Sequence, residues 1–164
     1  MLDSVSNVLN GVPGGLTRDN LSKILRPIVD RLSSQITATG GLAIKVGGSA
    51  LVKTANTVTY VAGGVHGSIA AADMPALTGL NISAGKYNVA VFYVNAAGTT
   101  SVRFGTEGST AALVKFPTPV EGTACIGYAL ITYASAFTGG TTALDTATTV
   151  YVNTIGPFDP SLIN

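Results

Sequence analysis

The chain has few ionisable side chains. Charged residues make up 10% of its 164 positions, against about 25% in an average soluble domain. Residues 40–164 contain ten of them, together with one histidine and one cysteine. Acid–base, nucleophilic and metal-assisted catalysis all need clusters of such groups. This scarcity favours a structural or binding protein over an enzyme.

Cysteine and long apolar runs are also scarce. Cys125 is the only cysteine, so an intrachain disulfide is excluded. It lies in the apolar run 124–128, where we expect a buried thiol in a protein made in a reducing compartment. No run approaches the ~18 apolar residues that a membrane helix needs. The N-terminus also lacks the basic region and apolar core of a signal peptide, so we expect a soluble protein made in a cytoplasm.

The chain has no broad basic field. Its net charge is +1, which argues against electrostatic steering onto nucleic acid. The basic residues of the N-terminal third are offset by acids at positions 3, 19 and 30. We expect them to form the solvated face of a helix rather than a phosphate-binding patch. They are Arg18, Lys23, Arg26 and Arg31.

What the chain does have is apolar and β-branched residues. The hydrophobic fraction is 46%, enough for one substantial core, and Val, Ile, Thr, Tyr and Phe favour strands. Disordered chains are poor in these residues. The low charge therefore predicts a folded protein, much of whose surface meets other protein, because a free monomer with so few charges would be poorly soluble.

The clearest periodic signal begins at residue 21. Apolar residues follow a helical period, with Thr17 as a candidate N-cap. They are Leu21, Ile24, Leu25, Ile28, Val29, Leu32 and Ile36. Pro27 falls inside the pattern, which predicts a kink or a division into two helical segments.

This apolar face is our candidate contact surface. Its residues are Leu21, Ile24, Leu25, Ile28, Val29 and Leu32. We expect the face to be buried, either against the rest of the same subunit or between subunits. The sequence leaves both arrangements open.

The pattern changes at residues 37–41, where period two replaces period 3.6. We therefore divide the chain into an N-terminal arm with an amphipathic helix, 1–39, and a β domain, 40–164. Turn signals and alternation predict strands near 42–46, 50–53, 57–61, 86–95, 99–105, 113–116, 125–133 and 149–154. A short helical turn is expected within 68–77, ended by Pro75. The predicted fold is mainly β: an antiparallel β-sandwich or jelly-roll-like body preceded by the helix and an extended arm.

The stretch 86–95 is the strongest strand candidate. Val89, Val91 and Tyr93 alternate with Ala90 and Phe92. Both faces of the strand are therefore apolar, which predicts a central strand that is covered on both sides.

Candidate chemistry is weak. His66 lies in the glycine-rich stretch 63–67, and a catalytic base would need a nucleophile and an orienting acid, of which Asp73 is the nearest in sequence. We expect a structural or surface histidine. The glycine pairs match neither the phosphate-loop nor the dinucleotide-binding pattern, so we interpret them as turns.

A resident metal or cofactor is not expected either. Asp145, Asp159, Glu107 and Glu121 are scattered singly, whereas a metal site needs three or four converging ligands. A calcium ion shared between subunits stays open. Glu107 and Glu121 could serve a glycosidase only if they converged. The tyrosines lie in strand patterns, and the absence of tryptophan weakens a sugar-binding interpretation.

Several stretches carry a resemblance to known proteins. They are 41–54 (GLAIKVGGSALVKT), 68–74 (SIAAADM), 104–108 (FGTEG), 116–117 (FP) with 126–128 (IGY), and 139–145 (GGTTALD). Together they span most of 40–159. In these stretches the chain resembles small β-rich structural proteins of tailed bacteriophages, of the head decoration or cement type. Residues 1–39 are not covered.

The resemblance implies a non-enzymatic virion protein on the capsid surface, synthesised in the host cytoplasm. It would stabilise the head by bridging major capsid proteins, as a homo-oligomer and most often a trimer, with no cofactor, nucleic acid or membrane involved. Two alternatives stay open. One is a fibre or receptor-binding module of the virion that recognises host glycan or protein, and the other is a small hydrolase built around His66.

Overall fold

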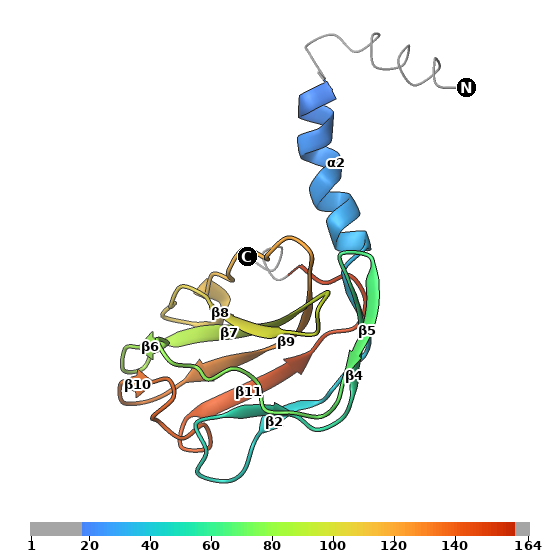
Figure 1. Cartoon of the computed structure of the whole chain (residues 1–164). Coiled ribbons are helices and arrows are strands. Elements are labelled where there is room, and N and C mark those ends of the chain that lie inside the picture. The colour runs from blue at the N-terminus through green and yellow to red at the C-terminus, as the bar shows by residue number, and fades with distance from the viewer. Residues whose placement is uncertain (1–17, 160–164) are drawn as a thin grey trace, which may run out of the picture.

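The computed structural model describes residues 18–159. They form a mainly β body and one α-helix, α2 (Arg18–Leu32), which stands away from the strands (Figure 1). The strands are β1 (Gln35–Ala38), β2 (Leu42–Ile44), β3 (Val52–Thr54), β4 (Val58–Ala62), β5 (Val65–Ile69), β6 (Asn81–Ile82), β7 (Tyr87–Asn95), β8 (Thr100–Phe104), β9 (Thr123–Thr132), β10 (Phe137–Thr138) and β11 (Thr148–Asn153).

All strand pairings are antiparallel, as expected. The largest sheet has the order β11-β9-β7-β8, a second has the order β1-β4-β5, and β2-β3 and β10-β6 form two-stranded pairs. The turn between β4 and β5 shows how sequence sets such a pairing. Gly63 and Gly64 both have positive φ, 56° and 81°, and the two-residue hairpin turn that matches strand twist needs positive φ at both positions.

Strand β7 is central and covered on both faces, which confirms the alternation seen in the sequence. Ala90, Phe92 and Val94 lie in the main core, which they share with residues of β1 and β4 from the second sheet. Val89 and Val91 lie in a smaller core on the opposite face. That smaller core is closed by side chains from the segments that follow β8 and β11, namely Val114, Phe116 and Phe158.

The residues of β9 that face the main core shift by one position at a β-bulge. Its pairing with β7 shifts register between Phe92 and Tyr93. Ala124 and Ile126 face the main core before the bulge, and Ala129 and Ile131 face it afterwards. Gly127 lies at the change with φ of 154°, and a Cβ on it would lie 2.3 Å from the Val152 carbonyl oxygen of β11. Only glycine fits this close approach.

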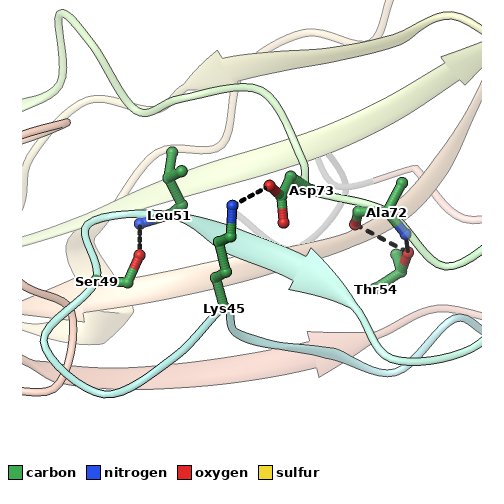
Figure 2. A network of polar contacts seen from close by, with 6 residues as sticks. All are labelled: Lys45, Ser49, Leu51, Thr54, Ala72 and Asp73. Carbon is green, nitrogen blue, oxygen red and sulfur yellow. Dashed lines mark hydrogen bonds and ion pairs between the residues drawn. The ribbon is translucent and has the colours of Figure 1, made fainter.

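The segment after β5 packs along β3 instead of forming the helical turn expected within 68–77. The Thr54 N–H donates to the Ala72 carbonyl (2.9 Å), and the Ala72 N–H donates to Thr54 Oγ1 (3.1 Å; Figure 2). An ion pair between Lys45 and Asp73 lies beside them (Figure 2). The Met74 N–H donates to the Val52 carbonyl (2.8 Å). The helix prediction was wrong because these backbone groups bond across to β3 rather than to their own neighbours.

Residues 113–116 were also expected to form a strand, and they do not. A 3₁₀ turn, η1 (Ala111–Leu113), occupies the start of the segment, followed by a single bridge between Lys115 and Thr106. Pro117 and Pro119 follow closely and lack the N–H groups that would extend the pairing.

The helix ends earlier than the apolar period suggested. Ile36 continues the stripe in sequence, yet it lies in β1, where it pairs with Tyr60 and is buried. The two-segment alternative for Pro27 was wrong, since α2 runs as one helix from Arg18 to Leu32. Thr17, the expected N-cap, lies outside the described residues. The domain division at 39/40 stays a prediction, although β1 already pairs with β4 before it.

Candidate interaction surface

Helix α2 is held to the body near its C-terminal end. The Gly122 N–H donates to Asp30 Oδ1 (2.8 Å), and the Gly64 N–H donates to the Ser33 carbonyl (2.9 Å). The Gly63 N–H donates to the Ser34 hydroxyl oxygen (3.0 Å). Two turns of the body, at 63–64 and 121–122, therefore hold the helix base, and the rest of the helix projects outward (Figure 1).

The apolar stripe predicted as a contact surface lies on this projecting helix. The side chains of Leu25, Ile28, Val29 and Leu32 are 46%, 47%, 61% and 65% exposed, and Leu21 is half-buried. The side chain of Ile24 is outside the described set. Within residues 18–159, the body leaves these four apolar side chains in solvent, where they are available for contact with a partner.

An open groove lies beside the helix. Its volume is about 530 Å³, and it is lined by Leu21, Ser22, Leu25, Arg26, Val29, Asp30, Ser33, Gly63 and Glu121. The helix supplies one wall, and the two anchoring turns supply the other. At the rim, Arg26 and Glu121 approach to 3.4 Å, but both side chains are more than 70% exposed. Such a pair contributes at most about 1 kcal/mol, so the apolar wall dominates the groove.

The loop at 121–122 was not predicted as part of this surface. In the sequence, Glu121 stands out only as a candidate catalytic or metal-binding carboxylate. Its neighbour Gly122 bonds to Asp30, 92 positions earlier in the chain. No local pattern in the sequence indicates such a contact, because it depends on the path of the chain through the whole body.

The candidate catalytic groups do not form a cluster. His66 lies in edge strand β5, exposed and opposite Val61, rather than in the expected loop. Asp73, the nearest acid in sequence, pairs with Lys45. Within residues 18–159, no group of three His, Cys, Asp or Glu side chains could hold a metal ion.

The two candidate glycosidase carboxylates have separate structural partners. Glu107 accepts hydrogen bonds from the N–H and the hydroxyl of Ser83, both at 3.0 Å. These bonds, the backbone one first, lower the pKa of Glu107. Glu121 faces Arg26 across the groove. Glu107 and Glu121 therefore make contacts that are typical of carboxylates in surface loops.

Cys125 is buried in the smaller core, as expected. Its thiol lies 3.9 Å from the Gly127 carbonyl oxygen, to which it donates. Burial raises the pKa of the Cys125 thiol from 9.0 to about 12, so the group is neutral at physiological pH. Burial also raises the pKa of Tyr93 beside it. A neutral, enclosed thiol is a poor nucleophile.

No family model, curated protein or solved structure matches this chain. The resemblance to phage decoration proteins therefore stays a prediction. Among the described residues, no helix is both long enough and apolar enough to cross a membrane. The geometry on which a functional proposal can be built is that of the α2 stripe and its groove.

Proposed function

We propose that this protein is a non-enzymatic structural component of a phage virion. It decorates or cements the head as a homotrimer that bridges major capsid proteins. The observation that carries the proposal is the exposed apolar stripe of α2, which projects from a body whose central strands are covered on both faces. Such a body provides a fixed shape and a surface for contact with other proteins.

The energetics of the stripe favour a binding role. Full burial of a Leu, Ile or Val side chain contributes about 1.5–3 kcal/mol. Four such side chains on α2 are about half exposed or more, which leaves several kcal/mol available for contact with another protein. Part of this is offset by the ordering of the side chains.

The β-sandwich or jelly-roll-like form of the body belongs to the same proposal. It is supported by the main core, in which Tyr60 of the three-stranded sheet and Phe92 of the four-stranded sheet are buried together. A rigid, layered body of this kind would suit a protein that spans the junction between capsomers and must resist their separation.

The test is binding to capsids that lack this chain. The purified full-length protein is mixed with particles assembled from the major capsid protein alone. We expect co-sedimentation, added density on the particle surface, and greater resistance of the particles to heating. A folded protein that neither binds such particles nor changes their stability contradicts the proposal.

A point variant locates the contact more sharply than a truncation. Removal of residues 1–36 would take Ile36 out of the main core and part of β1 with it. Ile28→Asp instead places a charge on the exposed stripe, and we expect it to weaken capsid binding at least 10-fold, either by disturbing a capsid contact or by breaking up the homotrimer. Val46→Asp is the matched control, because Val46 is equally apolar and exposed but lies in the turn after β2.

A further inference from the structure

The apolar residues of α2 follow a heptad repeat. Leu21, Leu25, Ile28 and Leu32 are separated by four, three and four positions. Leu21 and Ile28 are seven positions apart, as are Leu25 and Leu32, and a seven-residue repeat keeps side chains on a seam between supercoiled helices. In heptad terms Leu25 and Leu32 take position a, and Leu21 and Ile28 take position d.

Each flank of the seam carries one apolar and one polar residue, because Ser22 and Arg31 take the other e and g positions. Val29 follows at position e and is 61% exposed, and Ile24 takes position g in the sequence. Two-stranded coiled coils usually carry charged residues at e and g. Apolar residues there widen the stripe beyond what one partner helix covers. Both a positions are leucine and one of the two d positions is isoleucine, and leucine at a with isoleucine at d shifts preference from dimers towards trimers and tetramers.

The groove lies on one side of this seam. Its lining includes Leu21, Leu25 and Val29 but not Ile28. Each copy therefore offers two different flanks, one facing the groove and one facing away from it. When unlike flanks meet, the contact is heterologous, and such contacts close into a ring when the rotation between copies allows it.

We infer that the α2 helices of three copies of this chain form a parallel three-helix bundle. The groove of each copy receives the outer flank of its neighbour's helix. The bundle is parallel because three copies can be equivalent only around a three-fold axis, along which all helices run the same way. This inference rests on the homo-oligomer in the proposed function and names the element that builds it.

The area available predicts how strong the bundle is. A fully buried side chain of this size covers roughly 60–120 Å² of apolar surface. About half of each exposed side chain, Leu25, Ile28, Val29 and Leu32, is in solvent, which amounts to roughly 200 Å² per copy. A stable interface buries roughly 800 Å² per partner. The stripe alone therefore falls well short of a stable interface, whether one neighbour or two share it.

Further contact can come from the body at the helix base. Val65, at the start of β5, is 49% exposed, and it follows the turn that bonds to Ser33 and Ser34. It lies at the end of the body from which the three helices would rise. We expect a trimer that dissociates on dilution.

The first experiment measures the mass of the full-length protein by sedimentation velocity over a 100-fold range of concentration. We expect three times the chain mass of 16.5 kDa at high concentration. Ile28→Asp should raise the dissociation constant at least 10-fold, and Val46→Asp should leave it unchanged. Circular dichroism checks that both variants retain the β body. A wild-type monomer throughout, or an Ile28→Asp trimer of wild-type affinity, overturns the inference.

The second experiment tests the parallel arrangement with Leu21→Cys. In a parallel bundle the three introduced thiols meet at one level, and oxidation should link two of the three chains. Antiparallel helices would hold these positions apart and leave the chains unlinked, which would overturn the inference. Val46→Cys is the control, and the buried native Cys125 should stay reduced.

The two proposals can fail separately. A trimer that depends on Ile28 but does not bind capsids leaves the bundle standing and contradicts the decoration function. A chain that binds capsids with an unaltered Ile28→Asp oligomer overturns the bundle and leaves capsid binding standing.

Discussion

The carboxylate of Asp30, near the end of α2, accepts a hydrogen bond of 2.8 Å from the backbone N–H of Gly122. An acidic side chain in the last turn of a helix is unfavourable, because the helix macrodipole places negative charge there. The N–H from the distant loop offsets this. The contact fixes the direction in which the apolar stripe of α2 projects from the body.

Asp30→Ala should loosen this joint with little effect on the body. A hydrogen bond to a charged group contributes about 1.5–3 kcal/mol, but Asp30 is part exposed and its removal also relieves the helix macrodipole. We therefore expect a net loss of under about 1 kcal/mol in the free energy of unfolding. Amide exchange at Gly122 should rise clearly.

Asp30→Asn is the control, since its amide oxygen can still accept from Gly122. We expect near wild-type exchange at that amide. Equal protection of Gly122 in wild type and Asp30→Ala would show that the bond does not position the helix.

The stability that the contacts beside β3 provide should depend more on the hydroxyl of Thr54 than on the ion pair between Lys45 and Asp73. Thr54 is 1% exposed, and its hydroxyl bonds to Ala72. Thr54→Val keeps the shape but leaves the Ala72 N–H without that acceptor, which should cost about 1–2 kcal/mol. Lys45 and Asp73 are over 40% exposed, so Asp73→Ala should cost under about 1 kcal/mol and less at high salt. Urea unfolding at two salt concentrations checks this order, and the reverse order would contradict it.

Gly127→Ala should be among the most damaging single-methyl additions in the body. The new Cβ would lie 2.3 Å from the Val152 carbonyl oxygen, so β9 and β11 would have to separate. We expect a loss of about 3 kcal/mol or more in the free energy of unfolding.

Gly85→Ala separates steric clash from backbone strain. Gly85 also has positive φ, but no atom lies within 4 Å of the position that an added methyl group would take. Only the left-handed conformation is therefore penalised, by about 1–2 kcal/mol. Denaturant unfolding of both variants gives the comparison. Similar losses of stability in the two variants would show that β11 moves away from residue 127 without a free-energy cost, which would contradict the prediction.

Stability should fall at alkaline pH through the Cys125 thiol. Burial raises its pKa to about 12 in the folded protein, from an ordinary 9.0. Below pH 9 the thiol is protonated in both states. Between pH 9 and about 12 the unfolded chain releases the proton while the folded chain keeps it, so stability is lost as pH rises. By pH 10 the loss should be about 1.4 kcal/mol relative to pH 8.

Cys125→Ala isolates this contribution. The variant lacks the thiol but shares every other titrating group, including Tyr93. The difference in unfolding free energy between pH 8 and pH 10 should therefore be smaller by about 1.4 kcal/mol in the variant. An identical pH dependence would show that the thiol is not protected by burial.

Strong local signals predicted much of the fold. The two apolar faces of 86–95 indicated a central strand, and β7 is one. The Gly63-Gly64 pair marked a turn, which joins β4 and β5. The helical turn predicted within 68–77 was wrong, since backbone groups of Ala72 and Met74 form hydrogen bonds with β3. The mistake with Ile36 has a similar origin: an apolar residue at a helical interval satisfies the period even when the chain has already entered a strand.

The sequence by itself determined the chemical character of the protein: few ionisable groups, abundant strand-forming residues, and a helix with one apolar stripe. Those properties follow from composition and short-range periodicity. Only the tertiary structure decided that the stripe is left uncovered by its own body and lies beside a groove that Glu121 helps to line. That depends on Gly122 reaching Asp30 from 92 positions away, and contacts over such distances are set by the packing of the whole chain rather than by any local pattern.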